Sequence, residues 1–303
     1  MRKLVLLLAV VLGVLATAVP AWAITGNYVK DFEHPYVGLV TFYDAKGEFS
    51  HRCSGSLLTS EVFLTAGHCT SGETTEEGEE IPPPSSARVY FQQNAGANYD
   101  PETELDPVSG YPEKCAAGTL GKQCATSHEL YNYGFDDFAG FPNTRDAGLV
   151  ILDQPIQVSE YGKLAAPHSL DELATRRGQQ SLTFTSSGYG LTLSNPVSTT
   201  SFRERLMAKS TLTNLKSFNT DGFNLQTNGN GDGRGGTCSG DSGGPVFYGG
   251  YRSNKIVAVT SFGMNSYCKG VDFSYRTDRK AVITWILAHA PEDEASKIKI
   301  VEL

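Results

Sequence analysis

The segment Cys238-Ser239-Gly240-Asp241-Ser242-Gly243-Gly244-Pro245 places one serine in a glycine-rich turn, with an acid directly before it. A hydroxyl attacks a carbonyl only when a neighbouring base takes its proton, and the oxyanion that forms needs donors already in place. Glycines permit backbone conformations that a Cβ forbids, so the amides of Gly240 and Ser242 can point to one place. The pattern predicts Ser242 as a nucleophile and these two amides as an oxyanion hole. An isolated cluster of this kind is more often a surface turn, so a second motif must decide.

A histidine far upstream is the predicted base. His68 follows the apolar run Val62–Thr65 within the motif Thr65-Ala66-Gly67-His68-Cys69, which predicts a buried strand ending in a tight turn. The other five histidines lie in polar loops or near a helix end: His34, His51, His128, His168 and His289. We interpret them as surface or packing residues.

A third group, a buried acid, must hold the imidazole in the correct tautomer and stabilise the imidazolium. Asp146 stands just before the apolar run Leu149–Leu152 and is the predicted acid. Asp136 and Asp137 are weaker candidates, because no strand directly follows their aromatic, glycine-bearing loop.

The order of these residues separates two enzyme classes. Gly240 to Gly244 also fits the G-x-S-x-G nucleophile elbow of α/β-hydrolases, in which the acid and then the histidine follow the serine. After Ser242 only Asp272 or Asp278 and His289 remain, too short a stretch for the strands and crossover helices of that fold. An esterase of that class is therefore disfavoured, and the order histidine, acid, serine is that of the chymotrypsin template.

Taken together, the His68 and Ser242 motifs resemble the two signature motifs of trypsin-like serine proteases of the chymotrypsin fold, and Asp146–Leu152 resembles the family segment that carries the triad acid. The resemblance implies a serine endopeptidase with two packed six-stranded β-barrels and an active site between them. His68 and Asp146 would come from the first barrel and Ser242 from the second. The 32 glycines and the short apolar runs between turn signals independently favour an all-β fold.

The predicted strands are Val37–Tyr43, Ser56–Leu58, Val62–Thr65, Arg88–Phe91, Leu149–Leu152, Leu182–Thr185, Val246–Tyr248 and Lys255–Ser261. One helix is predicted near the end of the chain. Asp278 would cap it, Val282, Trp285 and Ile286 share one face, and Pro291 follows. It resembles the C-terminal helix of the family.

The first 23 residues have the three regions of a signal peptide: Arg2-Lys3, the apolar run Leu4–Ala18, and Ala21-Trp22-Ala23 at a cleavage site. The run is shorter than the roughly 20 residues that span a bilayer. We therefore expect residues 1–23 to be removed on export to the periplasm or medium, 24–290 to form the protease domain, and 291–303 to be a tail. The net charge of −8 disfavours a nucleic-acid partner, and we expect a monomer that acts on proteins or peptides without a membrane partner.

Export favours disulfides over metal binding for the six cysteines, whose spacings are not those of zinc sites. Spacing alone leaves 15 pairings open. The resemblance implies that Cys53 pairs with Cys69 behind His68, and that Cys238 pairs with Cys268 between the serine loop and the pocket wall. This leaves Cys115 with Cys124. We expect neither a metal nor another cofactor.

Two segments imitate calcium sites. The surplus between His68 and Asp146 includes Thr70–Ser86, which carries several glutamates (Glu73, Glu76, Glu77, Glu79 and Glu80). Such acid clusters can bind calcium, but they are more often solvated loop, which we favour. Asn228–Gly233 starts like an EF-hand loop, yet its twelfth position is Ser239 and no glutamate closes it, so we predict a turn.

Thr260-Ser261-Phe262-Gly263 resembles the family's Ser-Trp-Gly segment, with Phe262 in place of the tryptophan. The resemblance implies that Ser261 hydrogen-bonds near Asp146. Phe262 and Gly263 would offer an edge that pairs with the substrate backbone. The alternative is an ordinary strand end.

The specificity pocket is less defined. Gly236 stands at the family's pocket base, so no acid is present there to receive Arg or Lys. On the opposite wall, an inward Phe273 would give a shallow apolar pocket, whereas an inward Asp272 would again allow a basic side chain. We hypothesise a preference for apolar or small side chains at P1, the residue before the scissile bond.

Cleavage after Ala23 would leave Ile24-Thr25-Gly26-Asn27 at the amino terminus, which resembles the Ile-Val-Gly-Gly start of the family. The resemblance implies that the freed ammonium of Ile24 pairs with Asp241 and shapes the oxyanion hole. Signal cleavage alone would then activate the enzyme, unless Ile24 is merely where processing falls. A non-catalytic protease homologue that acts as a binding module is the second functional class, although such proteins usually lose a triad residue.

Overall fold

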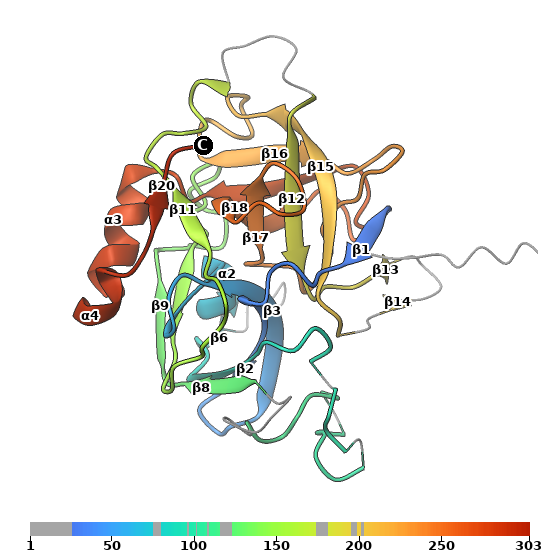
Figure 1. Ribbon diagram of the computed structural model, residues 1–303, viewed down its shortest axis with the longest axis vertical. Helices are drawn as coiled ribbons and strands as arrows, with labels where there is room; N and C mark the ends of the chain where they lie inside the picture. The colour runs from blue at the N-terminus through green and yellow to red at the C-terminus, as the bar shows by residue number, and fades with distance from the viewer. Residues whose placement is uncertain are drawn as a thin grey trace, which may run out of the picture.

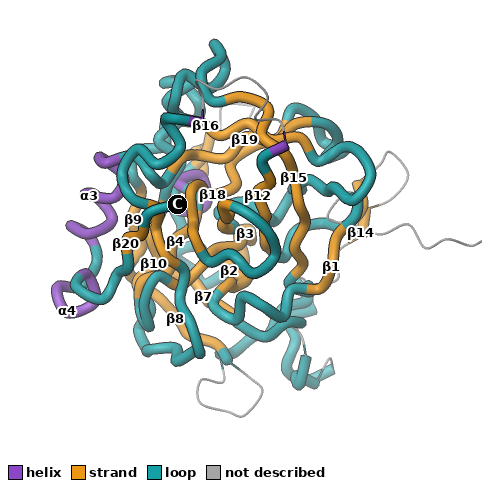
Figure 2. Tube along the Cα trace, turned by 45° about the horizontal axis from the view of Figure 1, so that its top comes forward, coloured by secondary structure: helices purple, strands orange, loops and turns teal. Residues whose placement is uncertain are grey.

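Two large β-sheets form most of the described part of the chain, one above the other in the view of Figure 1. The computed structural model describes residues 26–74, 80–95, 97–100, 102–107, 109–115, 123–173, 181–194, 199–200 and 203–303. Strands dominate both halves, and α3 and α4 lie together on one side (Figure 2). The expected all-β fold of two barrels with a C-terminal helix is confirmed.

The first barrel has seven described strands in the order β8-β7-β2-β3-β4-β10-β9. β8 and β9 lie at the two ends of this order, yet only His128 separates them in sequence, so one bend in the chain joins the two edges. The short hairpin of β5 and β6 is separate from this sheet. The bounds are β2 (Val37–Tyr43), β3 (Phe49–Leu57), β4 (Val62–Thr65), β5 (Glu73–Thr74), β6 (Glu80–Ile81), β7 (Ser86–Tyr90), β8 (Cys124–Ser127), β9 (Glu129–Asn132) and β10 (Gly148–Ile151).

The second barrel follows the order β17-β12-β15-β16-β19-β18, and β17 also pairs with β18, which closes the ring. β1, β11 and β20 add to its outside, while β13 and β14 form a separate hairpin. The bounds are β1 (Tyr28–Lys30), β11 (Lys163–Ala165), β12 (Thr183–Gly188), β13 (Leu193–Ser194), β14 (Thr199–Thr200), β15 (Leu206–Asn214), β16 (Asn224–Asn228), β17 (Pro245–Tyr248), β18 (Lys255–Gly263), β19 (Val271–Arg276) and β20 (Ile300–Val301).

A buried arginine joins the two barrels. Arg205, just before β15, donates from its guanidinium to the carbonyls of Val37 and Phe91 in the first barrel and to that of Asp31. The side chain is 3% exposed. A buried charge is tolerated only when such hydrogen bonds replace its water. Because breaking them would leave the charge unsatisfied, this junction holds the barrels, and hence the cleft between them, in one arrangement.

The C-terminal segment differs from the prediction at the cap of its helix. The helix α3 spans Lys280–His289 with Val282 and Ile286 buried, as expected, but Asp278 does not cap it. Asp278 instead accepts hydrogen bonds from the buried guanidinium of Arg276, because a buried cation needs a nearby anion. Within residues 291–303, α4 (Glu292–Ala295) is followed by β20, which pairs in parallel with β11.

The three expected disulfides, Cys53–Cys69, Cys115–Cys124 and Cys238–Cys268, are confirmed. Of the acidic loop, Glu76, Glu77 and Glu79 lie outside the described residues. At the EF-hand-like segment the Asn228 side chain accepts the amide of Asn230, as in a turn.

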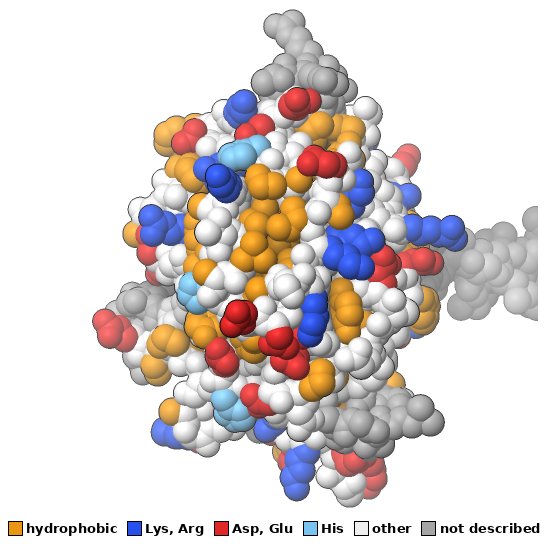
Figure 3. Space-filling model, turned by 60° about the vertical axis from the view of Figure 1, so that its left-hand side comes forward, with side chains coloured by type: hydrophobic (Ala, Val, Ile, Leu, Met, Phe, Trp, Pro, Cys, Tyr) orange, Lys and Arg blue, Asp and Glu red, His pale blue; other side chains and the backbone are white. Residues whose placement is uncertain are grey.

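On the face that Figure 3 shows, basic and acidic side chains are interspersed around an apolar area, with no continuous basic stripe. None of the helices in the described part of the chain is both long and apolar enough to cross a membrane.

Candidate active site

His68 lies in the short helix α2 (Gly67–Thr70), directly after the fully buried strand β4. The four apolar or β-branched residues of β4 fill the barrel, and the chain then turns at Ala66. The disulfide from Cys69 to Cys53 in β3 fixes the other end of the turn. His68 therefore sits on a rigid corner of the first barrel.

Asp146 contacts both the backbone and the ring of His68. One carboxylate oxygen accepts the backbone N–H of His68 at 2.7 Å, and the other lies 2.9 Å from His68 Nδ1. Ser261 in β18 donates its hydroxyl to the second oxygen. Because the carboxylate contacts both the backbone and the ring, it sets the orientation of the imidazole, with Nδ1 toward Asp146 and Nε2 on the opposite side of the ring.

The environment keeps Asp146 ionised although it is completely buried. Burial by itself raises the pKa of a carboxyl group, but the charge and hydrogen bonds of His68 and the hydroxyl of Ser261 outweigh it and lower the pKa of Asp146 below its ordinary value. A permanent anion beside Nδ1 stabilises the imidazolium. Asp136 and Asp137, the weaker candidates, are exposed on a loop.

Ser242 belongs to the second barrel, and its turn packs directly on the corner that carries His68. The backbone N–H of Ser54 in β3 donates to the Ser242 carbonyl at 2.8 Å. Gly243 adopts φ +78°, and a Cβ there would lie 2.1 Å from Thr65 Oγ1 and 2.5 Å from the Ala66 nitrogen. Only glycine allows this approach. The three triad candidates are thereby brought to one end of the interface between the barrels.

The turn also presents the predicted oxyanion donors. Gly240 has φ +95°, and its carbonyl accepts the Ser54 hydroxyl at 2.8 Å, so the peptide is held with its oxygen toward the first barrel. Among the described residues, the amides of Gly240 and Ser242 have no protein acceptor. Two amides available on one turn are what an oxyanion needs.

Asp241 points away from the triad into the protein. Its carboxylate accepts the backbone N–H groups of Gly190 at 2.8 Å and Cys238 at 2.9 Å. Burial raises the pKa of this carboxyl to about 6, and no described residue forms an ion pair with it. Gly188 and Gly190 make room for it, since a Cβ at either would lie 2.4 Å from Asp241 atoms. Sequence reasoning missed these glycines, although Gly188-Tyr189-Gly190 at the end of a strand is a detectable signal.

Ile24, the predicted partner of Asp241 in an ion pair, lies outside the described residues. The first described residues run beside the pocket segment, because Gly26 forms a bridge with Gly235 and the Asn27 amide donates to the Arg234 carbonyl at 2.8 Å.

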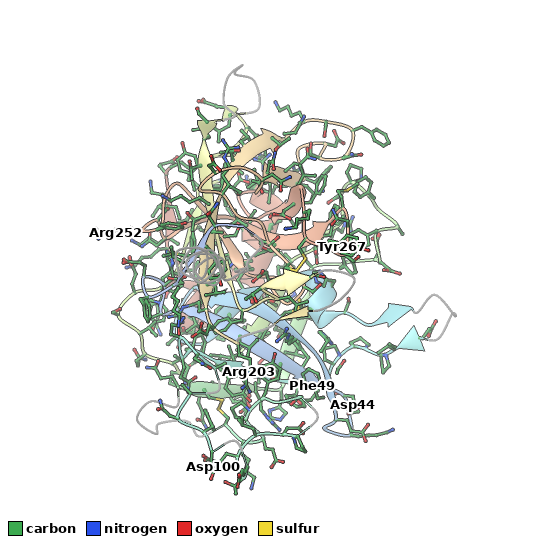
Figure 4. All side chains as sticks on the ribbon, turned by 90° about the vertical axis from the view of Figure 1, so that its right-hand side faces the viewer. Asp44, Phe49, Asp100, Arg203, Arg252 and Tyr267 are labelled. Atoms are coloured by element: carbon green, nitrogen blue, oxygen red, sulfur yellow. A yellow bond between two sulfur atoms is a disulfide. The ribbon has the colours of Figure 1, made fainter. Side chains whose placement is uncertain are left out.

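A cavity of about 160 Å³ opens beside Ser242. Its walls include Thr237 and Cys238 on one side and Phe262 and Gly263 on the other. The disulfide between Cys238 and Cys268 joins the wall that contains Thr237 to the loop that carries Tyr267. Figure 4 labels Tyr267, near the level where the two barrels meet. Gly236 is buried just before Thr237.

Asp272 and Phe273 point in different directions, as successive residues of a strand do. The Phe273 ring is buried and stacked on Phe262, with centroids 4.6 Å apart and planes at 5°. The Asp272 carboxylate accepts the Thr237 amide at 3.0 Å, so it lies behind that wall of the pocket. Burial, and to a smaller extent the nearby charge of Asp241, raise the pKa of Asp272 to about 7, although the hydrogen bonds from Thr237 act to lower it.

The grouping of described side chains tight enough to hold a metal ion consists of Cys53, His68 and Cys69. The two cysteines form a disulfide and offer no thiolate, so the grouping does not fit a metal.

The comparisons with known proteins agree with this geometry. A sequence profile described as Trypsin matches residues 23–109 and 117–286. The chain belongs to the trypsin family. The matched residues include both signature motifs and the acid between them, so the family assignment covers the whole candidate site of this trypsin-family chain.

Three curated relatives are serine proteases by name: CLIP domain-containing serine proteases B10 and B9 of Anopheles gambiae, and Serine protease 7 of Drosophila melanogaster. Each is 26% identical, over 46%, 71% and 75% of this trypsin-family chain respectively. The matches cover 34%, 50% and 54% of the relatives, so the chain spans only about a third to just over half of their length.

Solved structures show the same fold. HL collagenase has a TM-score of 0.56 at 17% identity, and the match covers 87% of this chain and 96% of that one. Human heparin binding protein has a TM-score of 0.55 at 18% identity, with 86% and 93% covered. At these identities the likeness shows the fold alone, and the two names describe cleavage in one case and binding in the other.

Proposed function

We propose that the protein is an exported serine endopeptidase that hydrolyses peptide bonds through an acyl-enzyme. The observation that carries the proposal is that the buried, ionised Asp146 contacts both the ring and the backbone of His68. The turn that carries Ser242 packs against the same corner of the first barrel. Ser242 attacks the scissile carbonyl, and His68 takes its proton and returns it to the leaving amine. Asp146 stays ionised, and the amides of Gly240 and Ser242 bind the oxyanion.

The substrate backbone would pair with the end of β18. In the described ladders β17 pairs with β18 only as far as Val259, so residues 261–263 have an open edge on that side. On their other side, Phe262 and Gly263 pair with Phe273 and Asp272. An extended peptide that adds to this edge puts its P1 side chain into the cavity beside Ser242.

We propose that the enzyme prefers substrates with an apolar or small P1 side chain at neutral and lower pH. Gly236 supplies no acid, the cavity is small, and Asp272 stands behind its wall with a pKa of about 7. Below that pH the carboxyl group is mostly neutral and does not attract a cation. Above it the ionised Asp272 would favour Arg or Lys, so the ratio of kcat/KM for Arg and Leu peptides should rise between pH 6 and 8. Both peptides are cleaved with the same base, so the protonation of His68 changes both rates equally and does not affect the ratio. The rise in the ratio with pH should be absent in the Asp272→Asn variant.

For activation, we propose that removal of residues 1–23 frees the Ile24 ammonium to pair with Asp241. Asp241 is a buried carboxylate among two amides, and an ammonium beside it would stabilise its charge. The described chain begins next to residues 234–235, close in sequence to this site. The three disulfides fit an extracytoplasmic compartment, and we propose that the enzyme acts there as a monomer on proteins or peptides.

Hydrolysis of a mixed peptide library by purified protein, with fragments identified by mass spectrometry, tests the proposal. We expect internal cleavages that disappear in Ser242→Ala and His68→Ala, while a matched change of an exposed serine away from the site, Ser159→Ala, leaves them. A folded protein that cleaves no peptide would support the second class, a non-catalytic binding module. The α/β-hydrolase alternative requires a parallel sheet with crossover helices and does not fit the two antiparallel barrels.

A further inference from the structure

Residues 291–303, the predicted tail, connect the two barrels along one side of the molecule. After α4 the chain turns and forms β20, where the carbonyls of Lys299 and Val301 accept the amides of Leu164 and Ala166 at 2.9 and 2.8 Å. β11, the partner of β20, also pairs with β18 of the second barrel. In Figure 1 these residues run from α4 to β20, which lies beside β11. We call residues 291–303 the strap.

The strap meets the first barrel at the turn between β3 and β4. The Ser60 hydroxyl in this turn donates to the carboxylate of Glu294, whose two oxygens lie 3.4 and 3.3 Å away. The ammonium of Lys297, also in the strap, pairs with the same carboxylate. Glu294 is 1% exposed, and a carboxylate is buried to this extent only with such partners. Ile298 is buried in the apolar core that also contains Leu58, so polar and apolar contacts together attach the strap to the first barrel.

Two hydrogen-bonded contacts between the barrels involve the strands to which the strap is attached. β3 carries Ser54, which binds the turn of Ser242 through its backbone amide and its hydroxyl. β18 carries Ser261, which donates to Asp146. A displacement of one barrel relative to the other would lengthen both contacts. Because the strap is joined to the turn after β3 and, through β11, to β18, it opposes that displacement.

The strap is a second junction between the barrels, after the buried Arg205. In Figure 1 β15, which directly follows Arg205, and β20 lie on opposite sides of the second barrel. Relative motion is the default for two bodies of one chain unless their interface prevents it. One junction lets the bodies rotate about it, whereas two junctions on opposite sides prevent that rotation.

We propose that the strap positions the two barrels for catalysis, and that Glu294 is the positioning residue that attaches it to the first barrel. The inference rests on the proposed endopeptidase function. Glu294 acts through the turn between β3 and β4 and touches neither substrate nor triad. Without the strap, small displacements of His68 relative to Ser242 would lower kcat, since misplacement by about 1 Å costs up to about 100-fold. The KM should change little, because the walls of the cavity beside Ser242 all belong to the second barrel.

The test compares the enzyme with a variant that lacks residues 292–303, using the peptide cleaved fastest in a library at a temperature well below unfolding. We expect kcat to fall by about 10- to 100-fold and KM to stay within about twofold. Adding a synthetic peptide of residues 292–303 should raise kcat again, whereas the same peptide with Ile298→Asp should not, because a charge is costly to bury there.

A single substitution tests the attachment itself. Glu294→Gln keeps the shape of the side chain and removes its charge, and it should lower kcat by about threefold or more. Glu302→Gln, the same change at an exposed position of the strap, should keep the wild-type kcat.

A wild-type kcat in both the folded truncated enzyme and Glu294→Gln would overturn this inference and leave the endopeptidase function standing, even if the temperature of unfolding falls. Equal losses in Glu294→Gln and Glu302→Gln would also overturn it. Absence of any Ser242-dependent hydrolysis by the full chain would overturn the proposed function and this inference with it. If the truncated variant does not fold, the two glutamate variants decide the question.

Discussion

Replacing Asp146 by Asn changes one atom and should disable the base without disturbing the fold. In the structure one carboxylate oxygen accepts the His68 amide, a donor that cannot be reversed. The side-chain oxygen of Asn must stay there, so its NH₂ group takes the other position, 2.9 Å from His68 Nδ1. An NH₂ group requires Nδ1 to be an acceptor. The ring proton then moves to Nε2, which can no longer take the proton of Ser242.

The expected loss follows from that tautomer. In the serine-protease template the same change lowers kcat by about 10⁴-fold, equivalent to about 5 kcal/mol of transition-state stabilisation. We expect a loss of this size in kcat for the best library peptide. The KM should change little, because the cavity and the end of β18 are untouched. Thermal unfolding followed by circular dichroism establishes that the variant is folded.

Asp137→Asn is the matched control, since it makes the same chemical change on the exposed neighbouring loop. It should keep kcat within about twofold of wild type. A loss below about 10-fold for Asp146→Asn, or an equal loss for both variants, would refute the assignment of Asp146 as the acid that orients His68.

Three further outcomes follow from the buried groups. The pKa of Asp272 is raised from 3.8 to about 7 in the folded protein, so the destabilisation caused by its buried charge is absent below pH 4 and complete above pH 7. Asp272→Asn should therefore raise the free energy of unfolding, measured with urea, by as much as ~4 kcal/mol at pH 8 and leave it unchanged at pH 4. An extra residue before Ile24 should lower kcat by about 10²-fold or more, as loss of an oxyanion donor does, and full activity in active-site-titrated enzyme would contradict the ion pair. Gly190→Ala should disrupt the Asp241 site because its methyl group would lie 2.4 Å from the carboxylate, whereas Gly250→Ala, with open space around it, should unfold at the wild-type temperature in a thermal scan.

The sequence predicted those strands and candidate site residues that short local motifs determine. β2 and β4 were predicted with their observed bounds, because unbroken apolar runs have no other place than a barrel interior. The structure brings His68, Asp146 and Ser242 together from three separate segments, each recognisable by a turn or strand beside the reactive residue. The disulfide pairs came from the family resemblance, since spacing left them open.

What the sequence could not predict depends on tertiary contacts. The ladder between β18 and β19 shifts between Thr260 and Phe262, so counting residues could not show which of Asp272 and Phe273 faces the pocket wall. The role of Asp278 depends on the buried cation of Arg276, which outweighs capping propensity. Phe262 contacts Phe138, which lies in a loop more than a hundred residues earlier, with ring centroids 5.3 Å apart, and no local pattern connects the two residues.

Labelling by a fluorophosphonate, with the modified residue identified by mass spectrometry, tests the central claim most directly. Such reagents react with a serine hydroxyl only when a neighbouring base and an oxyanion hole activate it. We predict one label, on Ser242, formed in the native protein after removal of residues 1–23 and lost in His68→Ala. A folded native protein that takes up no label, or takes it up on another serine, would contradict the account.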